Sequence, residues 1–459
     1  MFIVWTILLI TALGACDVSN GKNEHRLVQG RIIKLPGLIK PIDTGPYKKK
    51  QNFGLKKHVS KVPKTALSKD GLIKNLIINQ KIEQKIYIGL LLPLSGPNAS
   101  VGRSFLRAAQ IAFFEVANKN LVLLPRDTKG TPEGAREAAL AVLEVGATLL
   151  LGPVYSSSVL SVAPIAASAS VNMIAFSNDR ASVRKGGFIL GFLPKDRIQR
   201  VVSFAASKGF RKFAALIPRG RFGDRVALDF DTSVKNSGGI VVRSARYGSS
   251  RSSILAAVKN LSDYYHQKGA GLKTSGVVKK KQGPLSMKKP QTLRKDNTLQ
   301  GVAFEAVFLP ETGETLQAIA PLLPHFGIDI RKIRVLGIND WSVMPFRREP
   351  SLEGAWFAVP SRKYRNIFFK EFNRIYGLQP HPLSVLAYDS VALAALKANQ
   401  LGDGFSIKAL TEPEGYFGTA GLFRLQRNGL AEHKLSIMEL HPKKIRIISP
   451  APKLFFETK

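Results

Sequence analysis

The chain has 459 residues, of which 45% are hydrophobic and 22% charged, a globular composition with enough apolar residues for two or three cores. The 68 Lys and Arg outnumber the 32 Asp and Glu, and the net charge of +36 favours an anionic partner such as nucleic acid, acidic lipid or an acidic polymer. A single cysteine excludes a disulfide framework and a cysteine-rich zinc site, and the seven dispersed histidines form no local metal motif.

The N-terminal residues 1–15 are apolar and uncharged, which is typical of the central part of a signal peptide and too short for a comfortable membrane span. Leu13-Gly14-Ala15-Cys16 resembles the bacterial lipobox, although no Lys or Arg precedes it. The resemblance implies that Cys16 carries a lipid; the alternative is a buried cysteine in a core helix. Asp17 is similar to an inner-membrane retention mark, and the choice between inner and outer membrane stays open.

Two segments concentrate the positive charge. Residues 17–85 hold sixteen Lys or Arg against five Asp or Glu, and residues 266–300 hold nine against one. We expect a basic tether over 16–85, with a short helix near 72–84, and a disordered basic insertion over 266–300. Such runs are solvated chain or contact anionic lipid or cell-wall polymer. Export and this uneven distribution argue against a nucleic-acid partner.

From residue 86 onward, apolar runs alternate with amphipathic stretches, which predicts an α/β fold with doubly wound parallel sheets. The predicted strands are 86–94, 121–125, 148–151, 173–176, 213–217, 240–245, 303–309 and 333–337. The predicted helices are 101–118, 132–144, 156–169, 197–208, 224–236, 252–263, 315–323 and 384–397. A hairpin is predicted around Arg427-Asn428-Gly429 near the C-terminus.

Five motifs in order carry a family resemblance. They are PLSGP at 93–97 followed by Gly102, GP and SSS within 152–158, FGD at 222–224, AYDS at 387–390, and GLF ahead of NG within 421–429. Together they resemble the type I periplasmic solute-binding proteins of the Leu/Ile/Val-binding family. The resemblance implies two Rossmann-like lobes joined by three crossovers, with the ligand in the cleft between them.

The resemblance also implies boundaries. We expect lobe 1 to comprise 86–194 and 359–424, and lobe 2 to comprise 195–358 and 425–449. The crossovers are expected near 193–196, 358–361 and 422–426.

Polar residues follow several predicted strands, at the edge where open α/β sheets bind ligands. The candidate ligand-binding residues are Ser95, Tyr155, Ser156, Ser177, Asp179, Phe222, Glu311 and Asp340. Helix capping alone is the alternative for each polar member.

In the family, hydroxyl groups and helix N–H groups hold the carboxylate of an α-amino acid, and an acid from the second lobe holds its ammonium. The resemblance places Ser156 at the first hydroxyl, Asp340 or Glu311 at the acid, and Phe222 at a stacking aromatic. Asp179 departs from the family pattern, because its charge would repel a ligand carboxylate by roughly 4 kcal/mol at about 4 Å. Either Asp179 points away, Arg180 neutralises it, or the ligand is not held like a simple amino acid.

Two functional hypotheses follow. The first is a lipid-anchored periplasmic receptor for an amino acid, short peptide or other small polar solute, working with an ABC permease. The second is a regulator that contacts a cell-wall synthase, as in the penicillin-binding protein activators of the same fold. Enzyme motifs such as G-x-S-x-G, G-x4-G-K-[ST] and H-E-x-x-H are absent, so we expect neither catalysis nor a cofactor or metal.

Overall fold

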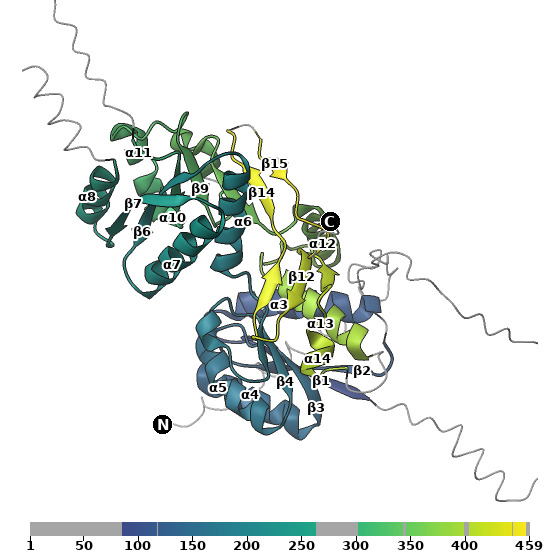
Figure 1. Ribbon diagram of the computed structural model, residues 1–459. Coiled ribbons are helices and arrows are strands. Elements are labelled where there is room, and N and C mark those ends of the chain that lie inside the picture. The colour runs from purple at the N-terminus through teal and green to yellow at the C-terminus, as the bar shows by residue number, and fades with distance from the viewer. Residues whose placement is uncertain are drawn as a thin grey trace, which may run out of the picture.

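The computed structural model of the chain describes residues 85–116, 118–262, 302–342, 346–398, 404–442 and 444–455. The expected signal peptide, Cys16, the tether up to residue 84, its helix near 72–84 and the basic insertion at 266–300 lie outside the described residues. The described chain forms two α/β lobes, one above the other in Figure 1, with the C-terminal strands running between them.

Lobe 1 begins with a five-stranded, wholly parallel sheet in the order β2-β1-β3-β4-β5. Its elements are β1 Ile86–Leu92, α3 Ala99–Val116, β2 Leu121–Asp127, α4 Pro132–Glu144, β3 Ala147–Leu151, α5 Ser156–Ser168, β4 Asn172–Ala175, the 3-10 helix η1 Arg180–Ser182 and β5 Gly187–Ile189.

Lobe 2 contains a seven-stranded sheet in the order β15-β14-β10-β9-β8-β6-β7, in which only β14 and β15 run antiparallel to their neighbours. Its first elements are α6 Pro194–Ser207, β6 Lys212–Pro218, α7 Arg221–Asn236, β7 Ile240–Tyr247, α8 Arg251–Leu261, β8 Ala306–Leu309, α10 Gly313–Ile319, α11 Leu322–His325, β9 Arg334–Gly337, the 3-10 helices η2 Phe346–Arg348 and η3 Pro350–Leu352, and β10 Trp356–Val359.

The chain then returns to lobe 1 and leaves it once more. The returning elements are α12 Arg362–Tyr376, α13 Val385–Ala398, α14 Ile407–Leu410 and a small antiparallel sheet of β11 Tyr416–Gly418, β12 Gly421–Leu425 and β13 Ala431–His433. The last strands, β14 Ser436–Glu439 and β15 Arg446–Ser449, complete the sheet of lobe 2.

Three passages therefore join the lobes, at 190–193, 360–361 and 434–435. The predicted fold class, two doubly wound lobes with three crossovers, is confirmed. The third crossover was expected near 422–426, and that placement is wrong. The reason is that β12 pairs with β13, so the predicted hairpin is completed within lobe 1 before the chain leaves it.

Each large sheet has apolar cores on both faces, as the continuous apolar strands predict. In β1, Leu90 and Leu92 join the core under α3 and α13, whereas Leu91 points to the opposite core under α4 and α5. In β6, Leu216 and Ile217 divide in the same way between the two cores of lobe 2. With both faces buried, the only polar edge left to these parallel strands is at their ends.

Several elements are absent from the sequence prediction, among them β5, β10 and α12. β5 has three residues and follows the short η1 turn, so its apolar run is too brief to stand out. α12 carries five Lys or Arg and buries only Phe368 and Phe372 among its residues, which leaves a weak apolar stripe. Among the described residues, no helix has the length and apolar character needed to cross a bilayer.

Asp389 ties the returning segment together. It lies buried on α13 and accepts hydrogen bonds from the backbone N–H and hydroxyl of Thr419, both at 2.8 Å. A Cβ on Gly418 would lie 2.4 Å from the Asp389 carboxylate, so only glycine fits there. Burial raises the pKa of Asp389 to about 7, against the lowering effect of these hydrogen bonds.

This pKa predicts a pH dependence of stability. Between pH 4 and 7 the folded chain keeps a proton on Asp389 that the unfolded chain releases, so this residue makes the free energy of unfolding fall as pH rises. Asp389→Asn should remove that contribution, which is at most about 1.4 kcal/mol per pH unit. Urea unfolding at pH 4.5, 5.5, 6.5 and 7.5 measures it. Burial also raises the pKa values of Glu115 and Asp196 to about 7, but both residues are present in the parent and in the variant. If the free energy of unfolding changes with pH by the same amount in the two proteins, the assignment to Asp389 is wrong.

Candidate functional site

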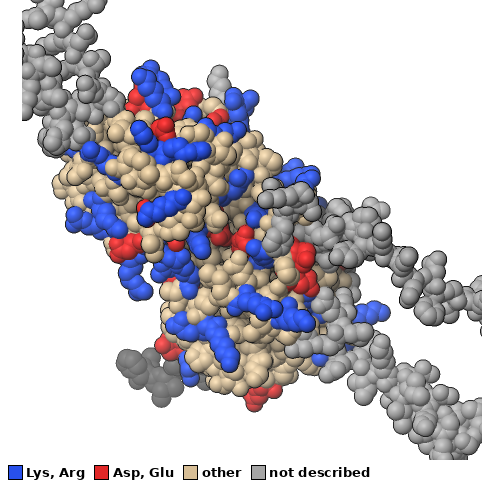
Figure 2. Space-filling view, viewed as in Figure 1, with Lys and Arg blue, Asp and Glu red and all other residues tan. Residues whose placement is uncertain are grey.

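The polar ends of the two parallel sheets face each other across the boundary between the lobes. In lobe 1 these ends follow β1, β3 and β4, and in lobe 2 they follow β6, β8 and β9. Ion pairs between residues that follow β4 and residues on α7 demonstrate that the two edges meet. The space-filling view shows the molecule narrowing between the lobes, where Lys and Arg side chains lie beside Asp and Glu side chains (Figure 2).

The loop after β1 is held by an acid that the sequence analysis did not select. Asp127, the last residue of β2, accepts hydrogen bonds from the backbone N–H groups of Leu94 at 2.8 Å, Ser95 at 3.2 Å and Lys129 at 2.8 Å. Partial burial raises the pKa of Asp127, but these bonds and one from the Ser95 side chain outweigh it and lower the pKa. Ser95 itself is exposed. Asp127 could have been identified from the sequence, because it lies just after the end of a predicted strand.

Tyr155 and Ser156 begin α5. A Cβ on Gly130 would lie 3.7 Å from the Tyr155 ring, so the loops after β2 and β3 are in contact. Tyr155 is the N-cap residue and makes no side-chain capping bond, and Ser156 is the first helical residue. The described chain offers no hydrogen-bond partner to the half-buried Ser156 hydroxyl, so capping alone does not explain this residue.

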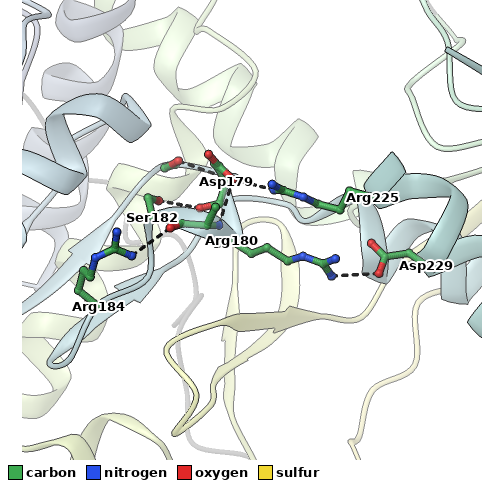
Figure 3. A network of polar contacts seen from close by, with 8 residues as sticks. Asp179, Arg180, Ser182, Arg184, Arg225 and Asp229 are labelled. Atoms are coloured by element: carbon green, nitrogen blue, oxygen red, sulfur yellow. Dashed lines mark hydrogen bonds and ion pairs between the residues drawn. The ribbon is translucent and has the colours of Figure 1, made fainter. Parts of the chain in front are cut away.

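Asp179 lies in a network that crosses between the lobes (Figure 3). Its carboxylate accepts hydrogen bonds from the Ala181 N–H at 3.0 Å and from Arg225 of α7 at 2.7 Å. The adjacent Arg180 pairs with Asp229, one helical turn further along α7, at 3.0 Å. We call these two ion pairs the rim bridge. The buried Ser177 hydroxyl accepts the Asp179 N–H at 3.1 Å and so orients the loop.

The rim bridge accounts for the negative charge of Asp179, which departs from the family pattern. Its charge is neutralised by Arg225 of lobe 2, whereas the expected partner Arg180 is engaged by Asp229. The hydrogen bond from Arg225 is the main cause that lowers the pKa of Asp179. Each pair is partly exposed and contributes on the order of 1 kcal/mol.

The two acids proposed from lobe 2 are already bound by protein groups. The Tyr247 hydroxyl donates to Glu311, whose pKa burial raises. Asp340 accepts hydrogen bonds from Arg362 at 2.8 Å and from the Ser342 N–H at 3.1 Å. The Trp341 indole N–H donates to the Glu311 carbonyl at 2.9 Å, so the two acidic loops are adjacent. A ligand ammonium would therefore compete with these partners for either acid.

Phe222 lies in the first turn of α7 and is 48% exposed, so its ring is available to a ligand. The neighbouring Gly223 permits this placement, because a Cβ there would lie 1.7 Å from the Pro218 carbonyl oxygen. An open pocket of about 420 Å³ lies elsewhere, at 411–413 and 424–428 in lobe 1, and contains none of the predicted residues. The described residues include no group of three His, Cys, Asp or Glu side chains that could hold a metal ion.

Comparison with known proteins agrees with this architecture. The family described as "Periplasmic binding protein" matches residues 85–443. The Leu/Ile/Val-binding protein BraC3 of Rhizobium johnstonii is 28% identical over 180 residues, which are 37% of this chain and 49% of that protein. The chain spans about half the length of the curated relatives it matches.

Solved structures share the fold. A Rhodospirillum rubrum protein described as a candidate branched-chain amino acid ABC transporter has a TM-score of 0.63 at 17% identity, covering 79% of this chain and all of that one. A substrate-binding protein of Desulfitobacterium hafniense, solved with Leu, has a TM-score of 0.55 at 16% identity, covering 80% of this chain and all of that one.

The rim bridge predicts a measurable effect on the lobes. Spin labels are placed on Glu144→Cys of α4 and Asn236→Cys of α7 in a Cys16→Ser background. Arg225→Ala should lengthen the distance between the labels or broaden its distribution, because Asp179 loses its partner across the boundary. Pulsed electron paramagnetic resonance measures that distance. The reversed pair Asp179→Arg with Arg225→Asp should restore it.

The control is Arg246→Ala, which breaks an ion pair with Asp224 that lies wholly within lobe 2. Identical distance distributions for Arg225→Ala and Arg246→Ala would show that the rim bridge does not hold the lobes.

Proposed function

The chain belongs to the periplasmic binding protein family, and on that premise we propose that it is the solute receptor of an ABC uptake system working outside the cytosol. The observation that carries the proposal is the boundary between the lobes. Polar strand ends of both sheets face each other there, joined by three chain passages that allow hinge bending. The fold shared with the leucine-bound Desulfitobacterium hafniense protein supports this assignment.

For the ligand we propose an amino acid or another small polar solute with a carboxylate. Ser156 offers an unbonded hydroxyl at the start of α5, where helix N–H groups favour an anion. Phe222 offers an exposed ring from the opposite lobe. Ser95, Tyr155, Ser177 and Asp179 shape the lobe 1 wall, and Glu311 and Asp340 shape the lobe 2 wall.

Calorimetric titration of the full chain tests the receptor proposal. The panel is leucine, isoleucine, valine, glutamate, benzoate and a dipeptide, and at least one member should bind. Ser156→Ala should weaken the binding about tenfold, because one hydrogen bond to a charged group is lost. Ser157→Ala is the matched control, since Ser157 is its exposed neighbour on the same turn, and it should bind like the parent.

A regulator of cell-wall synthesis is the second candidate, favoured by the rim bridge, because side chains of the two lobes pair directly with each other across the boundary. No heat of binding across the whole panel, together with direct binding to a purified peptidoglycan synthase, would favour the regulator over the receptor.

We further propose that Cys16 is lipidated and anchors the protein in the inner or outer membrane, on the periplasmic side. Cys16→Ser should move the protein from the membrane fraction to the soluble fraction of lysed cells. Incorporation of radiolabelled palmitate into the parent but not the variant would identify the lipid. Equal membrane fractionation of the parent and Cys16→Ser would rule the anchor out.

A further inference from the structure

Three arginines converge where the chain passes between the lobes. Arg197 lies in the first turn of α6, just after the first passage, and Arg362 and Arg365 begin α12, just after the second. All three surround Asp340, which follows β9. Arg362 contacts Asp340 at 2.8 Å, Arg365 approaches it at 3.7 Å, and Arg197 donates to the carbonyl of Ile338, two residues earlier, at 2.7 Å. We call these three residues the hinge arginines.

The hinge arginines have unused hydrogen-bond donors. Six buried side-chain nitrogen or oxygen atoms in the described part of the chain lack a partner, and three of them are the Nε atoms of Arg197, Arg362 and Arg365. Buried donors are nearly always paired, so three such atoms around one carboxylate are unusual.

Two other arginines, Arg200 and Arg334, provide a comparison for the contacts of a buried guanidinium group. Arg200, one turn beyond Arg197 on the same helix, donates its Nε to the Leu435 carbonyl at 2.8 Å and a terminal N–H to the Ser449 hydroxyl at 2.6 Å. Arg334 also has an unpaired Nε, and its guanidinium lies 4.7 Å from the centre of the Trp356 ring. Two of the hinge arginines make longer contacts of this kind, Arg197 at 5.8 Å from the Phe192 ring and Arg365 at 5.7 Å from the Phe369 ring.

Nearby acids do not balance the positive charge. Asp340 supplies one negative charge to three guanidinium groups. Asp196, beside Arg197, accepts the His433 N–H at 3.3 Å, and burial raises its pKa to about 7, so at neutral pH it is only partly ionised. Burial lowers the pKa of Arg197 to about 10, and the negative charge of Asp340 opposes that effect. The positive charge of Arg365 lowers the pKa of Arg197 further, which means that these two arginines repel each other.

The hinge arginines come from both lobes. α6 packs against α7 and the sheet of lobe 2, whereas α12 joins the core of lobe 1 through Phe368 and Phe372. About a fifth or less of the side chains of Arg362 and Arg365 is exposed, and 30% of the Asp340 side chain is. An anion placed among them would offset repulsion between the lobes, and low exposure would strengthen its attraction.

We propose that Arg197, Arg362 and Arg365 form a binding site for an anionic group of the solute other than the carboxylate placed at Ser156. This second group is a carboxylate or a phosphate, and the site thereby selects ligands that carry one. Paired N–H groups of arginine match the geometry of both oxyanions. This proposal rests on the proposed receptor function and specifies its ligand class. Asp340 was predicted from the sequence to bind a ligand ammonium. In this proposal Asp340 has a different role, which is to hold the arginines in place.

The experiment is calorimetric titration of the full chain at constant ionic strength with succinate, inorganic phosphate and leucine as separate probes. We expect succinate or phosphate to bind, and whichever binds identifies the oxyanion. Arg365→Gln and Arg197→Gln should weaken that binding at least tenfold. Arg365→Lys keeps the charge without the paired N–H groups, so it should bind with intermediate affinity. Arg246→Gln, which removes an arginine charge from the lobe 2 surface, should bind like the parent.

The outcomes separate the two proposals. Binding of leucine alone, with no response to succinate or phosphate, would overturn the anion site and leave the receptor function standing. Oxyanion binding that is unchanged in Arg365→Gln and Arg197→Gln would place the anion elsewhere and also overturn the site. Oxyanion binding that depends on these arginines, with no binding of any amino acid, would support the anion site and overturn the amino-acid ligand. If Arg365→Gln fails to fold, Arg365→Lys and Arg197→Gln still decide the question.

Discussion

The burial of both faces of each parallel sheet is the constraint on which the rest of the structure depends. Once helices cover both faces, the strands must be apolar along their length, and the polar groups of lobe 1 and lobe 2 can gather only where strands end. Because the two sheets are joined by three passages, these ends face each other. The boundary between the lobes is therefore the place where polar chemistry from distant parts of the chain meets.

Arginine–aspartate pairs organise this boundary at two places. At the rim, Asp179 and Arg180 of lobe 1 pair with Arg225 and Asp229 of lobe 2, so each lobe contributes one charge of each sign. At the hinge, the balance is unequal, because three arginines surround Asp340. The equal arrangement is suited to hold two surfaces together, and the unequal one is suited to receive a negative charge. The two places therefore differ in charge balance along the same boundary between the lobes.

Sequence reasoning succeeded where local pattern is enough. Continuous apolar runs predicted β1 to β4 of lobe 1 and β6 to β9 of lobe 2. Pro132 at the start of α4 and Asn428-Gly429 in the β12–β13 turn marked local boundaries well. It failed where a pattern is weak or a pairing is distant. The helix α12 was missed because its apolar face is small, and the third crossover was placed too early because the strand partner of β12 cannot be read from β12 itself.

By itself, the sequence determined the α/β order, the two-lobed family architecture and the polar residues at the strand ends. The α/β order and the strand ends follow from residues close together in the chain, whose periodicity and turn chemistry act locally, whereas the two-lobed architecture was implied by the family resemblance. Only the tertiary structure decided which charges meet. Asp179 finds Arg225 across 46 positions, and Asp340 finds Arg362 across 22, by way of two different lobes. Such pairing depends on how the sheets are placed in space. A long, flexible arginine side chain could pair with any of several acids, and the tertiary packing decides which acid lies within its reach.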